Sequence, residues 1–495
     1  MPKLKSTMLR KLQDWHRWLN RVGRQLLPIF AISGILHPVM TWTGPKAAAF
    51  YPPRAVMKAE YAGTIPRILA QNNITQALMV KIVPAENGAL LQVTEHNDQP
   101  RRYFDLASGA ERVDYDRQHA LWLARYYTGL KDEAIKDVHF QNEFDHAYPW
   151  GNRLLPVYPI SFDTDDNRTA FIYTELGALG NLTNDRKTTI QAVFRLLHTW
   201  SWLDNVPYAR PLVMLVFLAS LFGLALTGMA MVFLLKHRKI PDQKRRWHRL
   251  ISYLVWIPLL AFTASGTYHL LQYAYGGETT RGLKLGAPIS ISAENFGANS
   301  DWLAPYQNTK LNAISLVQSP EGDLLYRLGI PKGRAGQKVT RAERFDGTPI
   351  EKPALYFDAK TGAESVVNDR AMALAYAEKY MGLPADKIIH SELITRFGAG
   401  YDFRNKRLPV WRVDYDSANG DMLYIDPASG ILVDRAINTE RLESLSFSFL
   451  HKWNFLTPMI GRVARDGLIV FILCLALGGT LFGYTMLLKQ RKKRK

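Results

Sequence analysis

The stretch WHRWLNRVGRQLLPIFAISGILHP, residues 15–38, is a long apolar run with a histidine near each end, His16 and His37. About 20 apolar residues are enough to cross a bilayer, and three further runs of comparable length follow in the chain. The four predicted spans cover residues 24–43, 211–235, 250–272 and 466–488. An even number of spans places both ends of the chain on one side of a membrane. The sequence therefore predicts a four-span membrane protein.

Basic residues gather beside the membrane ends of these spans. Residues 1–24, 236–249 and 489–495 together hold 20 Lys and Arg against two acidic residues, and the whole chain has a formal net charge of +18. The rest of the chain is therefore neutral. Because Lys and Arg beside spans mark the cytoplasmic side, we interpret this charge as a topology signal and expect membrane lipid, and no nucleic acid, as its surroundings. Both termini are then cytoplasmic.

The predicted organisation follows from the spans. Alternating stretches at 77–83 and 410–415 predict strands, residues 116–127 and 369–381 predict helices, and each large segment outside the cytoplasm is expected to be a small α+β domain. Span 1 has charged flanks and no small-residue cleavage site, so we expect an uncleaved anchor. The segments between and beside the spans are a cytoplasmic tail (1–23), outer domain 1 (44–205), a cytoplasmic loop (236–249), outer domain 2 (273–457) and a basic tail (489–495).

An internal repeat relates the two halves of the chain. YFDLASGA at 103–110 matches YFDAKTGA at 356–363, LPVYPISF at 155–162 matches LPVWRVDY at 408–415, and LLHTWSWL at 196–203 matches FLHKWNFL at 449–456. These pairs are all 253 residues apart, and spans 1 and 3 match at an offset of 232. A tandem duplication in which each copy crosses the membrane twice predicts a pseudo-twofold axis along the membrane normal.

Six of the twelve histidines have a histidine at the equivalent position of the other half. The pairs are His16 with His248, His37 with His269, and His198 with His451. In each half 21 residues separate the first two members, or about 31 Å along a helix, which is close to the hydrocarbon thickness. Facing imidazoles at matched depth suit the two axial positions of a b-type haem. Ser33-Gly34 and Ser265-Gly266 would let a flat macrocycle or a partner helix approach.

Other interpretations of these histidines remain open from the residues alone. A histidine at a membrane boundary is often an interfacial side chain, and the Trp-His-Arg tripeptides serve equally well as aromatic and positive anchors. His198 and His451 precede their spans and could serve structure or substrate. A zinc site would need about four close ligands. The single cysteine, Cys474, excludes disulfides, iron–sulfur clusters and covalent haem attachment.

The His-Arg…Ser-Gly pattern of the first span, the Leu-His…Trp motif and the sequences YFDLASG, YFDAKTG and YIDPASG resemble PepSY-associated transmembrane proteins over nearly the whole chain. The Ser-Gly-x-x-His ending of spans 1 and 3 is similar to the inner-membrane ferric-siderophore reductases of the FoxB type. The resemblance implies two periplasmic PepSY-like domains, a bacterial inner-membrane location and bis-histidine b haems. It also implies an oxidoreductase that passes electrons across the membrane to ferric siderophores, or to other ferric chelates, for iron acquisition.

By this resemblance, two b haems are expected, with His16 and His248 on the haem of the cytoplasmic side. For the outer haem we place His37 with His269 ahead of pairings that use His198 or His451. The sequence assigns no catalytic residue, and a homodimer is compatible with it. Since the chain contains no GxGxxG and no P-loop, the electron donor is expected to be a separate flavin reductase, a soluble flavin or a membrane quinol.

Two other hypotheses compete with this one. The first is a membrane-anchored PepSY binding or regulatory module without redox activity, in which the membrane histidines are replaceable. The second is a quinone-linked cytochrome that serves another periplasmic acceptor.

Overall fold

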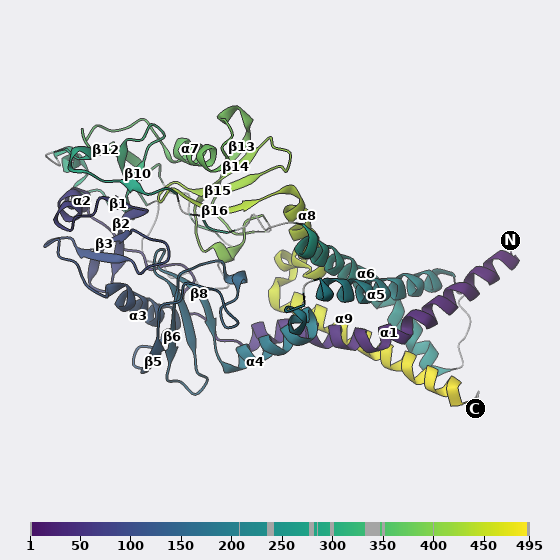
Figure 1. Cartoon of the computed structure of the whole chain (residues 1–495). Helices are drawn as coiled ribbons and strands as arrows, with labels where there is room; N and C mark the ends of the chain where they lie inside the picture. The colour runs from purple at the N-terminus through teal and green to yellow at the C-terminus, as the bar shows by residue number, and fades with distance from the viewer. Residues whose placement is uncertain are drawn as a thin grey trace. The chain divides into compact units, whose positions relative to one another are not determined.

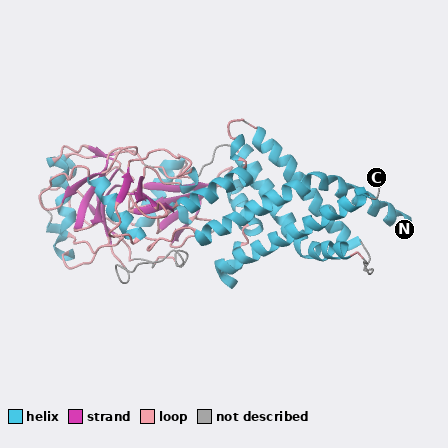
Figure 2. Cartoon of the chain, turned by 90° about the horizontal axis from the view of Figure 1, so that it is seen from below, coloured by secondary structure: helices cyan, strands magenta, loops and turns pink. Residues whose placement is uncertain are grey.

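In the computed structural model of the protein, the described residues are 2–206, 208–234, 242–276, 282–284, 286–297, 301–331, 347–348, 352–398 and 400–492. The chain divides into a helical unit, residues 1–44, 186–279 and 439–495, and a sheet unit, residues 45–185 and 280–438. The long helices belong to the helical unit, and every described strand belongs to the sheet unit (Figure 2). Each unit takes segments from both halves of the chain.

In the described residues of the helical unit, four long helices form a bundle (Figure 1): α1 (Pro2–Thr43), α5 (Ala209–Leu234), α6 (Gln243–Tyr275) and α9 (Thr457–Lys492). α1 packs against α5 and α9, and α6 packs against the same two helices, so α1 and α6 are diagonally opposed. Each of the four contains a stretch long and apolar enough to cross a membrane. Large apolar side chains such as Val216, Leu254 and Phe471 are exposed on the bundle, which suits lipid as the solvent.

The helices continue beyond the predicted spans. α1 includes residues 2–23 of the predicted tail, which contain no proline after Pro2. α6 begins at Gln243, inside the predicted loop 236–249, where the Asp242 side chain caps it by accepting a hydrogen bond from the Arg245 backbone N–H. Several residues of the predicted basic segments lie outside the described residues: Lys236, Arg238, Lys239, Lys493, Arg494 and Lys495.

A short helix leads into each returning long helix. α4 (Asp185–Phe194) continues into a π-helical turn, η2 (Arg195–Thr199), and α8 (Asn438–Ser446) continues into a second one, η9 (Phe447–His451). Residues 186–205 and 439–457 therefore belong to the helical unit, although the sequence pattern assigned them to the outer domains. The two turns are 252 residues apart at their starts and contain the repeated Leu-His motif.

Both halves of the chain contribute three strands to one six-stranded antiparallel sheet, in the order β12-β11-β10-β2-β3-β4. The first half supplies β2 (Met79–Ala85), β3 (Gly88–Thr94) and β4 (Arg102–Asp105), and the second half supplies β10 (Ala313–Gln318), β11 (Leu324–Gly329) and β12 (Leu355–Asp358). β2 and β10 join the halves, with Lys81 opposite Ser315. Because β2 and β10 are repeat-equivalent and antiparallel, this pair marks a local pseudo-twofold axis.

Each half also forms a four-stranded antiparallel sheet of its own. α3 (Tyr115–Thr128) packs against the sheet of the first half, and α7 (Asp369–Met381) packs against that of the second. The strands and helices predicted at 77–83, 410–415, 116–127 and 369–381 are confirmed, since β2, β14, α3 and α7 cover them in whole or large part. The strands of these sheets are β5 (Ile135–Val138), β6 (Tyr158–Phe162), β7 (Thr169–Tyr173) and β8 (Ala178–Thr183), then β13 (Ile388–Ile394), β14 (Val410–Tyr415), β15 (Met422–Asp426) and β16 (Ile431–Ala436).

The shorter elements complete the sheet unit. β1 (Gln76–Ala77) pairs with β9 (Ile289–Ser290), which again joins the two halves. α2 (Glu60–Gln71) lies against one face of the six-stranded sheet and buries Ile65, Ile68 and Leu69 there. This face is apolar because alternate side chains of each strand point to it.

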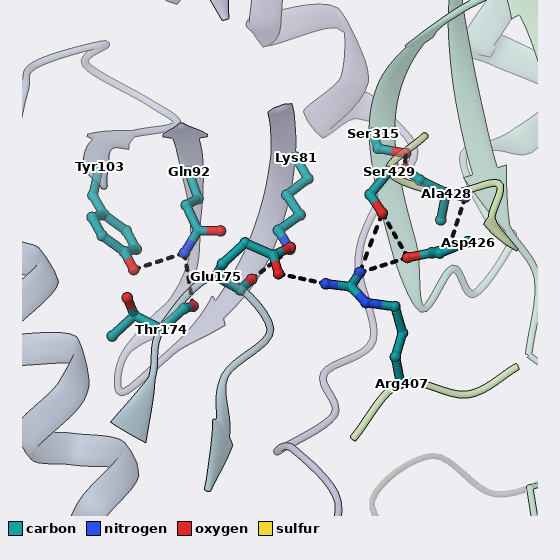
Figure 3. A network of polar contacts seen from close by, with 10 residues as sticks. All are labelled: Lys81, Gln92, Tyr103, Thr174, Glu175, Ser315, Arg407, Asp426, Ala428 and Ser429. Carbon is teal, nitrogen blue, oxygen red and sulfur yellow. Dashed lines mark hydrogen bonds and ion pairs between the residues drawn. The ribbon is translucent and has the colours of Figure 1, made fainter. Parts of the chain in front are cut away.

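The opposite face of the six-stranded sheet is polar and buried. Its cross-strand row consists of Tyr103, Gln92, Lys81, Ser315, Arg327 and Tyr356. Lys81 donates to both the backbone carbonyl and the carboxylate of Glu175, each at 2.5 Å, and Arg407 of the second half donates to the same carboxylate (Figure 3). Arg407 also bonds to Asp426 at 2.6 Å. These buried charges stabilise the fold only as a set, because removing one partner leaves the others buried without an opposite charge.

Candidate functional site

One histidine pair lies inside the bundle on its two diagonal helices. His16 is on α1 and His248 is on α6, within electrostatic reach of each other. The Nδ1 atom of His16 lies 3.0 Å from the Thr227 hydroxyl on α5, and the Nδ1 atom of His248 lies 2.9 Å from the Gly479 carbonyl on α9. All four helices therefore contribute to this inner site.

A second histidine pair comes from the two π-helical turns. His198 of η2 and His451 of η9 face each other with 6.3 Å between ring centroids and 80° between ring planes. The Nδ1 atom of His198 lies 2.9 Å from the Ser33 hydroxyl, and that of His451 lies 3.2 Å from the Ser265 hydroxyl. Ser33 and Ser265 are repeat-mates on α1 and α6, and both are buried. The outer site thus joins the Leu-His motif to the Ser-Gly motif in each half.

The hydrogen bonds define the tautomer of all four rings. The Ser33 hydroxyl already donates to the Ile29 carbonyl at 2.7 Å, so it accepts from the His198 Nδ1–H. Ser265 and Thr227 donate in the same way to carbonyls one turn earlier. The partner of His248 is a carbonyl, which only accepts. A neutral ring in this arrangement carries its proton on Nδ1 and keeps the Nε2 lone pair available as a metal ligand.

Aromatic side chains hold the rings of the outer pair. Phe194 stacks on His198 with centroids 4.7 Å apart, and Phe447 stacks on His451 at 4.5 Å. Phe30 and Phe262, from α1 and α6, approach the same two rings at 5.8 Å and 5.5 Å. Each imidazole is thus oriented by a hydrogen bond, a stacked ring and a second aromatic side chain, and the arrangement is the same in both halves.

The tryptophan that follows each outer histidine has an unusual backbone. Trp200 and Trp453 adopt φ values of 53° and 50°, in the left-handed region that bulky residues rarely occupy. Their indole N–H groups donate back to the carbonyls of Leu197 and Leu450. Strained backbone and π-helical turns both concentrate at functional sites. Their repetition in both halves indicates that the position of the histidine matters.

Burial keeps the outer pair neutral. It lowers the pKa of His198 to about 4, with a contribution from His37. It lowers the pKa of His451 to about 3, with contributions from His198 and Lys452. Only a neutral imidazole has a lone pair for a metal, so both rings are ready to act as ligands at neutral pH.

The distance between the two outer rings is close to the one expected for two imidazoles that share a metal ion. Two metal–nitrogen bonds of about 2 Å, plus about 1 Å from each nitrogen to its ring centre, give centroids about 6 Å apart, and the observed value is 6.3 Å. Among the described residues, no group of three or more His, Cys, Asp or Glu side chains could hold a metal ion. Two protein ligands are what a six-coordinate haem iron takes, since the porphyrin supplies the remaining four.

Glycines adjoin the histidines at both sites. A Cβ on Gly228 or Gly483 would lie 3.6 Å and 3.5 Å from the Cε1 atoms of His16 and His248, respectively, and one on Gly266 would lie 3.8 Å from that of His451. The helix backbone therefore runs directly beside these imidazoles, and a larger side chain would reduce the space around them.

The remaining predicted ligands, His37 and His269, lie beside the outer pair and are not part of it. Both are exposed, and each contacts the phenylalanine that stacks on an outer-pair histidine: His37 lies 6.1 Å from Phe194, and His269 lies 4.5 Å from Phe447. The Nδ1 atom of His269 is 2.6 Å from the Glu443 carboxylate. The structure thus brings His198 and His451 together, where the sequence pattern preferred His37 with His269.

Sequence reasoning missed the residues that orient the rings. The Ser-Gly motif was interpreted as a close-approach surface, whereas its serines accept hydrogen bonds from His198 and His451. Thr227 was not singled out, although it is a polar residue in an apolar run and has a threonine, Thr480, 253 residues later. A polar residue repeated inside two spans was the available signal.

Comparison of the chain with protein-family models found no match, and comparison with curated proteins found none either.

Proposed function

We propose that the protein holds two b haems in its helical bundle and passes electrons across a membrane to ferric chelates, the siderophores above all. The observation that carries this proposal is the set of four imidazoles with the Nδ1 proton engaged and Nε2 available, arranged as two pairs. One or two such histidines occur in many cores. Four, in two repeat-related pairs, are the ligand set of two bis-imidazole haems.

We assign His16 and His248 to the inner haem and His198 and His451 to the outer one. Ser33 and Ser265, to which the outer histidines bond, each lie 17 residues beyond the inner histidine on α1 or α6. That separation is about 25 Å along a helix, most of the hydrocarbon thickness. The two sites therefore lie near opposite ends of the bundle, as an electron path across a membrane requires.

The bound haem would supply one-electron chemistry, and this chain's residues supply its setting. The hydroxyls of Ser33, Ser265 and Thr227 hold the Nδ1–H groups, which fixes ring orientation and raises the basicity of each ligand. The phenylalanines beside the outer pair pack against the imidazole rings and hold their orientation. Lys452, next to His451, is a cation suited to a porphyrin carboxylate.

The charge pattern supports the direction of transfer. The basic residues beside the spans favour cytoplasmic termini, so His16 and His248 would face the donor, and the sheet unit, with its PepSY-like strand-end motifs, would be periplasmic. Ferric iron is a suitable acceptor, because its siderophore oxygens are hard ligands that hold Fe(II) less tightly. A flavin reductase, a soluble flavin or a membrane quinol would supply the electrons.

The test begins with the pyridine haemochromogen assay on protein purified from haem-replete cells, where two haems per chain are expected. Dithionite should shift and sharpen the Soret band, and a ferric hydroxamate such as ferrioxamine should reoxidise the reduced protein. A colourless protein would overturn the proposal and favour a regulatory module without redox activity. A reduced protein that ferric chelates leave unoxidised would instead favour a cytochrome for another acceptor.

A further inference from the structure

The repeat symmetry of the helical unit breaks at one exposed histidine. Glu443 is on α8, one turn before Phe447 of η9, and its carboxylate is 2.6 Å from His269 Nδ1. The equivalent residue of the first half, one turn before Phe194 on α4, is Ile190. Thus His269 has a carboxylate partner on this neighbouring helix, and its repeat-mate His37 has an apolar residue there.

The charges around the two exposed histidines differ as well. His37 feels the positive charges of Lys452, Arg462 and Arg465 together with the negative charge of Asp466. The His269 side chain is 50% exposed, and Glu443 beside it is 15% exposed, so this nitrogen–oxygen pair is open to solvent on one side. The Lys452 ammonium lies 4.8 Å from the centroid of Phe447, the ring that stacks on His269, so positive charge adjoins both histidines. The Glu443 carboxylate is what distinguishes His269, where a cation has an accessible nitrogen–oxygen pair.

The His269–Glu443 pair is also close to the outer histidine pair. Phe447 stacks on His269 with centroids 4.5 Å apart, and its ring also stacks on His451 at 4.5 Å. A single aromatic ring thus separates the exposed pair from an imidazole of the outer site. An acceptor reduced at that site would release its iron within a short distance of His269.

We propose that His269 and Glu443 form a transient binding site for a divalent transition-metal cation. The cation is the ferrous iron that leaves the reduced chelate. This inference rests on the proposed function for the identity of the metal. Imidazole suits Fe(II), which has lost much of its preference for hard oxygen ligands. With only two protein donors, water or the departing chelator completes the coordination, so the ion is held weakly and is released.

The step balances with the reactants already named. One electron from the reduced protein converts Fe(III) in the chelate to Fe(II), and the iron–oxygen bonds to the chelator then break. The freed chelator oxygens take protons from water. New bonds form from iron to an imidazole nitrogen of His269 and to a carboxylate oxygen of Glu443. For Nδ1 of the neutral ring to bind the iron, its proton moves to solvent and Nε2 takes up a proton from water, so the ring stays neutral.

Isothermal titration of the haem-loaded full chain with Co²⁺ tests the site directly, because Co²⁺ binds such ligands slightly more tightly than Fe²⁺ and is stable in air. One equivalent should bind to the wild-type protein. Glu443→Gln and His269→Asn should each weaken binding by about tenfold or more, with haem content unchanged. His37→Asn is the matched control and should bind Co²⁺ as the wild type does.

A substitution that adds a carboxylate in the other half shows that weaker Co²⁺ binding in these variants does not come from loss of folding. Ile190→Glu places a carboxylate one turn before Phe194, beside His37, and should raise the stoichiometry from one Co²⁺ to two. Unchanged binding in Glu443→Gln, or equal losses in His37→Asn and His269→Asn, would overturn the inference while the proposed function stands. The opposite outcome is a protein that binds Co²⁺ as expected but, once reduced, is not reoxidised by any ferric chelate. That outcome would support the divalent-cation site and overturn the proposed function.

Discussion

Removing the hydroxyl of Ser33 tests how the outer site is built. In Ser33→Ala the His198 Nδ1–H loses its acceptor, which lies 2.9 Å away on a serine with 0% exposure. Because Ser33 is fully buried, the unpaired donor should cost about 1.5–3 kcal/mol of ligand binding. At 1.4 kcal/mol for each factor of ten, haem affinity at the outer site should fall about 10–100-fold.

The measurement is haem transfer from the purified variant to an apoprotein scavenger, followed by the Soret band. One of the two haems should leave faster from Ser33→Ala, and the other should leave at the wild-type rate. A weaker ligand also favours the ferrous state, so the reduction potential of the outer haem should rise. Ser265→Ala should behave in the same way, because Ser265 holds His451 in the second half.

The matched control is Ser220→Ala on α5, whose hydroxyl donates only to the Val216 carbonyl of its own helix. It should leave both haems and both potentials unchanged. If Ser33→Ala releases haem no faster than Ser220→Ala does, the serine does not orient a ligand, and the assignment of His198 to the outer haem loses its main support.

Three further outcomes are expected. His198→Ala should remove one haem equivalent in the haemochromogen assay, whereas His37→Ala should retain both; the opposite pattern would restore the pairing preferred from sequence. Glu175→Gln should destabilise the sheet unit by about 3–5 kcal/mol, because it leaves Lys81 and Arg407 buried without their carboxylate. The measurement is denaturant unfolding followed by near-ultraviolet circular dichroism, and Asp137→Asn, at an exposed position, is the control. The wild-type sheet unit should lose stability as pH falls from about 4.5 to about 2; constant stability across that range would contradict the ion network.

The sign of the acid effect follows from the charges around Glu175. Burial alone would raise the pKa of this carboxyl, but the neighbouring Arg407 and Lys81 lower it to about 2. A carboxyl whose pKa is lower in the folded state stabilises the protein above the unfolded pKa of about 4.5, and the stabilisation disappears as pH falls through the folded value. The shift corresponds to about 3 kcal/mol. Glu175→Gln should show less acid dependence over this range.

The sequence determined the architecture of the bundle, because local composition is sufficient for it. A run of about 20 apolar residues has one stable conformation in lipid, a helix, and four such runs are readable without any tertiary information. The alternation of apolar and polar residues at 410–415 similarly predicts a strand. The motifs that recur 253 residues apart reveal the duplication. The same repeat identified the six paired histidines and placed His16 opposite His248.

Only the tertiary structure decided which outer histidines meet. Sequence spacing places His37 near the end of a helix but does not show that the π-helical turn before α5 carries His198 to Ser33, 165 residues away. Likewise, no local pattern shows that β2 pairs with β10, or that Glu175 of one half binds Arg407 of the other. The physical reason is that hydrogen bonds and ring stacking depend on side-chain positions in space, and segments distant in sequence are brought together only when the chain folds.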